Sequence, residues 1–226
     1  MNKGRVNFRL GALTGILALG AALTAQAQVF NIAIQNSDFS ENFTGGTITG
    51  YDNPADDIPG WSDAGINNDS GVTDADLGTG AVAPYAFVLS GDAGAIQVTS
   101  HTIGDGNSYT LTWDAAGVGE TSQSVYLFSI NSDLTGFSVL NSNSDLISGT
   151  MSPFSLNYTA TATDAGKLLG IGFSGGGTPG GYATYDNFTA NFVPVPEPAA
   201  YTLAGSLMLA GFAAYRRFRP SAKPTV

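Results

Sequence analysis

The chain has 226 residues, no cysteine and 18 acidic residues against 8 lysines and arginines, which gives a formal net charge of −10. Without cysteine it has no thiol nucleophile, no thiolate metal ligand and no disulfide. The acidic balance argues against nucleic acid and anionic lipid as partners, because both are negatively charged. Most cations lie near the two ends, so Lys167 is the only one between residues 28 and 198.

Residues 1–27 read as a signal peptide. Three cations precede an apolar run over 10–23, and Ala25 and Ala27 are the small residues that a signal peptidase reads. We expect cleavage after Ala27 and a mature, exported protein that begins at Gln28.

Residues 28–192 predict one all-β domain. Short runs of β-forming residues are separated by Gly, Asn, Asp and Ser, and no helical stripe of useful length is seen. In the clearest run, Tyr109–Trp113, Tyr, Leu and Trp face one side, so we assign Trp113 to the core. The expected strands are Phe30–Ile34, Ala86–Leu89, Ala95–Thr99, Ser108–Trp113, Ser124–Ser129, Phe137–Leu140, Phe154–Thr161, Leu168–Phe173 and Tyr185–Phe192. This spacing predicts an antiparallel β-sandwich or jelly roll, with a long loop region over 44–84 that holds one or two irregular strands.

Four short motifs in the body occur in a familiar order. They are QNSDFSENF (Gln35–Phe43), IPGW (Ile58–Trp61), YTLTWD (Tyr109–Asp114) and TYDNF (Thr184–Phe188). Together they resemble secreted carbohydrate-binding-like β-sandwiches of the galactose-binding-like type. The resemblance implies a jelly roll and makes glycan a candidate ligand.

The same resemblance implies a structural Ca²⁺ where the first and last strands meet. The matching positions are Asp38 and Ser40 on the first strand and Asp186 on the last. The usual Glu of that site is replaced by Ser40, and Glu41 follows one residue later, which points it to the opposite face of a strand. Since Ca²⁺ takes six to eight oxygens, this departure weakens the site. The alternative is that Asp186 and Asn187 only turn or cap the strand.

Exposed aromatic rings that can stack on sugar faces are the natural ligand-binding candidates. Tyr51, Trp61, Tyr85 and Tyr182 lie in or near loops and are our candidates. The alternative for each is ordinary packing in the core or a loop, since aromatic side chains bury large areas.

No catalytic residue stands out. His101 is the only histidine, it lies at the end of an expected strand, and no G-x-S-x-G motif accompanies it, so a Ser-His-Asp triad is not indicated. The acids offer no preferred pair for glycoside hydrolysis. The acidic run over 67–78 does not match the EF-hand pattern, and we interpret it as a solvated loop. The sequence therefore favours a protein that is not an enzyme, without deciding the question.

The C-terminal tail has three parts. A proline-spaced linker covers 193–198, an uncharged apolar run covers 199–215, and a basic segment covers 216–226. As a helix, 199–215 would span about 25 Å, which predicts a transmembrane helix that suits a thin or locally thinned bilayer. The basic segment would then remain in the cytoplasm.

This order of parts resembles the PEP-CTERM sorting signal of Gram-negative bacteria that make extracellular polysaccharide. The residues that carry the resemblance are Pro196, Glu197 and Pro198, followed after the apolar run by Arg216 and Arg217. The resemblance implies that an exosortase-type membrane protease processes the tail, with a precursor held transiently at the inner membrane. The alternative is an ordinary C-terminal anchor.

Taken together, these features predict an exported protein of the periplasm, cell surface or extracellular polysaccharide matrix. Its acidic sandwich would bind glycan or serve as a structural component such as an adhesin or spacer. The alternative is a calcium-dependent carbohydrate-active enzyme or cyclase on the same type of fold.

Overall fold

The computed structural model describes residues 28–41, 58–64, 70–88, 94–119, 121–147, 149–177, 181–195 and 198–218. Contacts divide the chain into two units, Val29–Pro194 and a second unit formed by the two ends. The expected signal peptide with Ala25 and Ala27 lies outside the described residues, as do Pro196 and Glu197.

The unit 29–194 consists of strands joined by turns. The strands are β1 (Phe30–Ile32), β2 (Ser62–Asp63), β3 (Ser70–Thr73), β4 (Tyr85–Val88), β5 (Gly94–Thr102), β6 (Ser108–Val118), β7 (Thr121–Ile130), β8 (Ser138–Asn143), β9 (Leu146–Ile147), β10 (Ser152–Thr159), β11 (Leu168–Gly177) and β12 (Tyr182–Val193). Every strand expected from the sequence overlaps one of these. The loop region over 44–84 contributes the short β2 and β3, and β9 was not expected.

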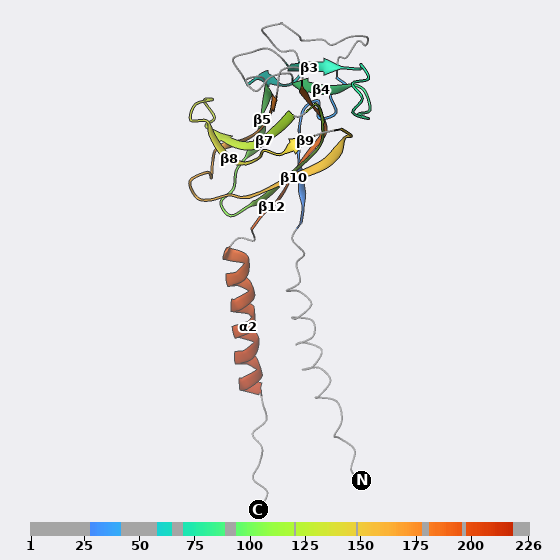
Figure 1. The fold of residues 1–226 in the computed structure, drawn as a ribbon. Helices are drawn as coiled ribbons and strands as arrows, with labels where there is room; N and C mark the ends of the chain where they lie inside the picture. The colour runs from blue at the N-terminus through green and yellow to red at the C-terminus, as the bar shows by residue number, and fades with distance from the viewer. Residues whose placement is uncertain are drawn as a thin grey trace, which may run out of the picture. The chain divides into compact units, whose positions relative to one another are not determined.

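The strands form two antiparallel sheets that make a β-sandwich, as the sequence predicted (Figure 1). The first sheet has the order β10-β6-β12-β4-β3, with β1 also paired to β12. The second has the order β2-β5-β11-β7-β8, with β9 also paired to β7. The chain changes sheets between β6 and β7, where Gly119 takes a φ of +78° that a side chain would disfavour.

The core lies between the sheets and is rich in aromatic rings. Trp113 is 1% exposed, which confirms its assignment to the core, and its ring stacks on Phe154 and Phe188. Phe173 of β11 and Phe188 of β12 bring the two sheets together at a ring-centroid distance of 5.5 Å. The long strands β5, β6 and β7 reach this core mainly through every second residue, because successive side chains on a strand point to opposite faces.

One buried hydrogen bond also joins the two sheets. The indole N–H of Trp113 on β6 donates to Oε1 of Gln123 on β7 at 2.9 Å. Gln123 is 0% exposed, so its carbonyl oxygen depends on this donor. Loss of the donor would leave a buried acceptor unpaired.

The tail forms one helix, α2 (Pro198–Phe218), so the helix expected over 199–215 is present. Arg216 and Arg217 lie exposed in its last turn, where they complement the helix dipole. By length and hydropathy, none of the helices in the described residues could cross a membrane. The expected membrane crossing is therefore not borne out, because the Gly, Ser, Thr and Tyr residues lower the mean hydropathy of the apolar run.

The Trp113–Gln123 pair predicts a graded loss of stability. Trp113→Ala should lower the free energy of unfolding by about 3–5 kcal/mol through the lost volume and the unpaired Gln123. Trp113→Phe should cost less, since it keeps most of the ring. Urea unfolding measures both, with Ser155→Ala on the exposed face of β10 expected to stay within about 0.5 kcal/mol of the wild type. Equal stability for Trp113→Ala and the wild type would contradict this account.

Candidate functional site

The segment after β1 does not continue as a strand, contrary to the expectation for Asp38 and Ser40. Residues 35–41 form turns in which Asn36 and Phe39 take φ values of 49° and 53°. The Asn36 side chain fixes this turn, since its Nδ2 donates to the Pro59 carbonyl at 2.8 Å. The chain therefore leaves the β12 edge after β1 and turns back.

Within this turn the Asp38 carboxylate is held locally. Its Oδ1 accepts hydrogen bonds from the Ser40 hydroxyl at 2.9 Å and from the Ser40 backbone N–H at 3.3 Å. These bonds hold the pKa of Asp38 below its usual value. Ser40 thus serves as a partner for Asp38 in this structure, with its hydroxyl directed to the carboxylate.

Asp186 lies on the edge of β12 between its pairings with β4 and β1, beside a bulge. Burial raises its pKa to about 6, and the negative charges of Asp114 and Asp38 add to the shift. The backbone N–H of Asn187 partly offsets this by donating to Asp186 Oδ1 at 2.8 Å. The structure therefore brings the predicted ligands Asp38 and Asp186 within electrostatic reach of each other.

The calcium site implied by the resemblance has two carboxylates, Asp38 and Asp186. In the described part of the chain, no group of three or more His, Asp or Glu side chains could hold a metal ion. The Asn187 side chain, at a φ of 55°, donates its amide N–H to Asp114 Oδ2 at 3.0 Å and so presents a donor to a carboxylate that could have been a ligand. Asp38 and Asp186 supply fewer oxygens than the six to eight that Ca²⁺ takes, and calcium binding stays a prediction.

The ligand-binding candidates chosen from the sequence lie in different surroundings. Trp61 and Tyr85 are 3% and 2% exposed, so neither ring has a free face for stacking on a sugar. Trp61 packs on Phe173 at 5.1 Å, and the Tyr85 hydroxyl donates to the Ala75 carbonyl at 2.6 Å. Tyr182 is half-buried at the start of β12. Tyr51 is outside the described residues.

His101 is a packed residue at the end of β5. Its Nε2 lies 3.2 Å from the Tyr109 hydroxyl, and its ring lies 4.4 Å from the Phe192 ring centroid. Burial lowers its pKa, which favours the neutral imidazole. This arrangement pairs the histidine with a phenol.

The outward face of the first sheet is polar. The hydroxyls of Thr112 on β6 and Thr189 on β12 lie 2.6 Å apart, and the Thr110 hydroxyl donates to Asn157 Oδ1 on β10 at 2.8 Å. An antiparallel sheet with one face in the core and the other in water shows this pattern.

The outward face of the second sheet is different, because it carries rings and aliphatic groups. Strand register places two rows of residues across it, each running from β5 over β11 to β7. The rows are Ile96, Gly172, Tyr126 and Val98, Gly170, Phe128. The central strand thus contributes glycines, and the strand beside it contributes aromatic rings.

The two rings lie directly on the glycine backbone. A Cβ added to Gly172 would lie 2.3 Å from Cζ of Tyr126, and one added to Gly170 would lie 2.0 Å from Cζ of Phe128. Each ring therefore occupies the space in which a side chain on β11 would stand.

Phe137 completes the cluster from the turn before β8. Its ring lies 4.6 Å from Phe128 and 6.4 Å from Tyr126, and it is 50% exposed. We call Tyr126, Phe128 and Phe137 the aromatic platform. Phe128 is 0% exposed and forms its buried base, so the rings open to a ligand are Phe137 and the half-buried Tyr126. Burial raises the pKa of Tyr126, so its hydroxyl remains protonated and able to donate a hydrogen bond at neutral pH.

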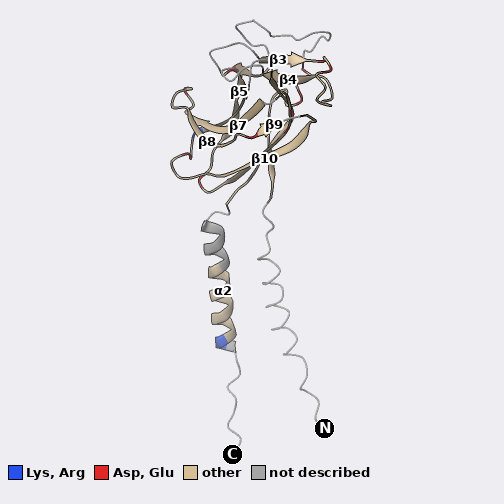
Figure 2. Cartoon of the chain, in the orientation of Figure 1, with Lys and Arg blue, Asp and Glu red and all other residues tan. Residues whose placement is uncertain are grey.

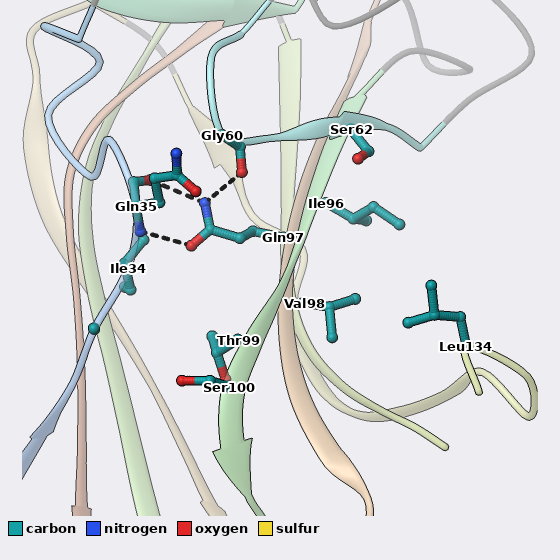
Figure 3. Close-up of a pocket in the computed structure, with 11 residues that line it drawn as sticks. Ile34, Gln35, Gly60, Ser62, Ile96, Gln97, Val98, Thr99, Ser100 and Leu134 are labelled. Carbon is teal, nitrogen blue, oxygen red and sulfur yellow. Dashed lines mark hydrogen bonds between the residues drawn. The ribbon is translucent and has the colours of Figure 1, made fainter. Parts of the chain in front are cut away.

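A groove of about 530 Å³ lies at the β5 edge of the same sheet (Figure 3). Ile96 and Val98 line it, and Leu134 closes one side. The buried Gln97 holds its upper wall, since its Nε2 donates to the carbonyls of Gln35 and Gly60 at 2.9 and 2.8 Å. Because Ile96 and Val98 also belong to the two cross-strand rows, the groove and the aromatic platform share one face of the sheet.

The aromatic platform was not predicted from the sequence, because the candidate rings were chosen in or near loops and the platform lies mainly on a strand. The usable signal was in β7, where Val125 and Leu127 alternate with Tyr126 and Phe128, so both faces of the strand are apolar. In β6, by contrast, polar residues separate the apolar ones. An antiparallel strand that is apolar on both faces has a covered or ligand-binding outer face.

Known structures share this fold. The Stig cyclase Fisc from Fischerella sp. TAU, solved with (3Z)-3-(1-methyl-2-pyrrolidinylidene)-3H-indole, is 18% identical, covers 75% of this chain and 100% of its own, and has a TM-score of 0.56. An apo cyclase from Fischerella sp. is 19% identical, with coverages of 76% and 100% and a TM-score of 0.54. A CBM4 structure is 20% identical, with coverages of 71% and 99% and a TM-score of 0.47. No model of a known protein family matches the chain, and a search of curated proteins finds no match.

The raised pKa of Asp186 gives a pH prediction. Because the folded pKa of about 6 exceeds the unfolded value near 3.9, ionisation of Asp186 disfavours the folded state, and stability should fall as pH rises from about 4 to 7. Asp186→Asn should raise the melting temperature at pH 7 and flatten this part of the profile. Thermal unfolding across the pH range measures it.

The same variant tests calcium. If Asp186 is a ligand, Ca²⁺ should raise the melting temperature of the wild type at pH 7 and EDTA should reverse the rise, while Asp186→Asn should not respond. A melting temperature that neither Ca²⁺ nor EDTA changes rules out the structural ion.

Proposed function

We propose that this protein is an exported glycan-binding β-sandwich and that the outward face of its second sheet is the binding surface. The observation that supports this most directly is the contrast between the two sheets. One outward face is a set of hydrogen-bonded threonines and asparagines. The other carries the aromatic platform and the adjoining groove.

Aromatic rings suit sugars because a pyranose presents apolar C–H groups on its face and hydroxyls at its edge. A partly exposed ring stacks on the C–H groups of the sugar face, and nearby donors and acceptors hydrogen-bond the hydroxyls at its edge. Phe137 offers an exposed ring, and the Tyr126 hydroxyl offers a donor beside it. Ser62 and Ser100 add exposed hydroxyls at the groove.

Export rests on the two ends of the sequence. In this proposal signal peptidase removes residues 1–27, and an exosortase-type protease acts on the tail that contains Pro196, Glu197 and Pro198. The product is an acidic domain at the cell surface or in the extracellular polysaccharide matrix of a Gram-negative bacterium. Matrix polysaccharide is then the natural partner.

A second candidate function is acid-assisted catalysis, as in a carbohydrate-active enzyme or a cyclase. The observation in its favour is Asp186, whose pKa of about 6 keeps part of its population protonated near neutral pH. Asp186 lies on β12 of the first sheet and not on the aromatic platform. Turnover of a polysaccharide that is lost in Asp186→Asn would favour this candidate.

Glycan binding can be tested on an array together with hydrolysis assays. We expect the purified protein to bind at least one polysaccharide without degrading it. Phe137→Ala removes the most exposed ring of the aromatic platform and should weaken binding about tenfold or more, which corresponds to 1.4 kcal/mol or more. Thr112→Ala on the opposite sheet is the matched control and should leave the affinity unchanged. Turnover of a glycan with no measurable binding would reverse this ranking of functions.

Processing can be tested by intact-mass measurement of the protein recovered from the cell surface or medium. The expected mass lacks residues 1–27 and the segment that follows the Pro196–Pro198 motif. A recovered protein that still carries the full tail would contradict exosortase-type processing.

A further inference from the structure

We infer that the ligand of the aromatic platform is an uncharged glycan and that Gly172 is the residue that positions the Tyr126 ring to receive it. This inference rests on the proposed glycan-binding function and names its ligand class and a positioning residue. Two observations carry it, the charge of the surface and the contact between ring and glycine.

The four longest strands of the second sheet carry no formal charge, and the nearby charged residues, Asp63 on β2 and Asp133 in the turn before Phe137, are acidic. The sequences of β5, β7, β8 and β11 contain no Asp, Glu, Lys or Arg, and the labelled strands β5, β7 and β8 are drawn in tan in Figure 2. A site built for uronate or sulfated glycans would place Arg or Lys beside the rings, because anionic oxygens are recognised by charge-assisted hydrogen bonds.

The charge of the whole domain also disfavours anionic glycans. Lys167 is the only cation between residues 28 and 198, against acidic residues that number 18 in the whole chain. It lies in a turn with Asp164, whose carbonyl accepts its backbone N–H at 3.2 Å. A polyanion would meet an acidic protein with no cationic patch, so long-range electrostatics oppose its approach.

Gly172 sets the height of the Tyr126 ring. It stands opposite Tyr126 in the β7–β11 register, and a Cβ at this position would come within 2.3–2.6 Å of the ring atoms Cζ and Cε2 and the hydroxyl oxygen. Any other residue here would force the ring away from the sheet. The glycine therefore lets the Tyr126 ring lie against the β11 backbone, and the other side of the ring is the one that would meet a sugar.

The experiment measures binding of the purified protein by affinity electrophoresis at 20 mM and 500 mM NaCl. The probes are three neutral polysaccharides, a β-glucan, a galactan and a xylan, and two uronates, alginate and polygalacturonate. We expect retardation by at least one neutral polysaccharide, unchanged by salt, and none by the uronates.

The residue assignment is tested in the same gels. Tyr126→Ala and Gly172→Ala should each weaken binding about tenfold. The double variant should be no weaker than Tyr126→Ala, because Gly172 acts through that ring. Ser174→Ala, at the next outward position on β11, is the matched control and should bind as the wild type does. Phe137→Ala, an exposed position, keeps the platform testable if Gly172→Ala fails to fold.

The outcomes distinguish a failure of this inference from a failure of the proposed glycan-binding function. Salt-sensitive binding to uronates alone overturns the ligand class but leaves glycan binding standing. Binding to a neutral polysaccharide that Tyr126→Ala and Phe137→Ala leave unchanged overturns the assignment to the aromatic platform. A further loss in the double variant overturns the positioning role of Gly172. Retardation by none of these probes counts against glycan binding itself.

Discussion

The burial of one face of β11 in the core determines the outward face of the second sheet. Leu169, Ile171 and Phe173 are 0% exposed between the sheets, and Phe173 contacts Phe188 of the first sheet and Phe39 of the turn after β1. Because side chains alternate along a strand, this burial forces Gly170 and Gly172 outward. The bare backbone at these two positions lets rings from β7 lie across the sheet. The core and the aromatic platform are thus two results of one alternation.

The strands could be predicted from the sequence because this alternation is local. Tyr109, Leu111 and Trp113 show it plainly, and the structure places all three in the core. The outward role of Tyr126 and Phe128 could not be assigned in the same way. Which of two apolar faces of β7 points inward depends on its pairing with β11 and β8, and that pairing joins residues far apart in the chain.

The candidate site was harder to predict for a related reason. Trp61 follows a Pro-Gly turn that suggests an exposed loop, yet Gly60 with a φ of +83° directs the indole into the ring cluster of Phe39, Phe173 and Phe188. Asp38 sits in a motif that resembles a strand, but the Asn36 bond to the Pro59 carbonyl bends the chain there. Long-range contacts decided both cases, and a local pattern does not contain them.

Gln97 affects whether the edge of β5 can pair with a strand of a second molecule. β5 is paired by β2 only at Ile96 and Ala95, which leaves it close to being an edge strand. The Gln97 side chain both donates to and accepts from the backbone of Gln35 and so ties another segment beside that edge. An edge covered in this way does not offer a ladder to a second molecule. Gln97 therefore removes one part of the β5 edge from pairing with a second molecule, and the part that follows it, Val98 to Ser100, is left open as the groove.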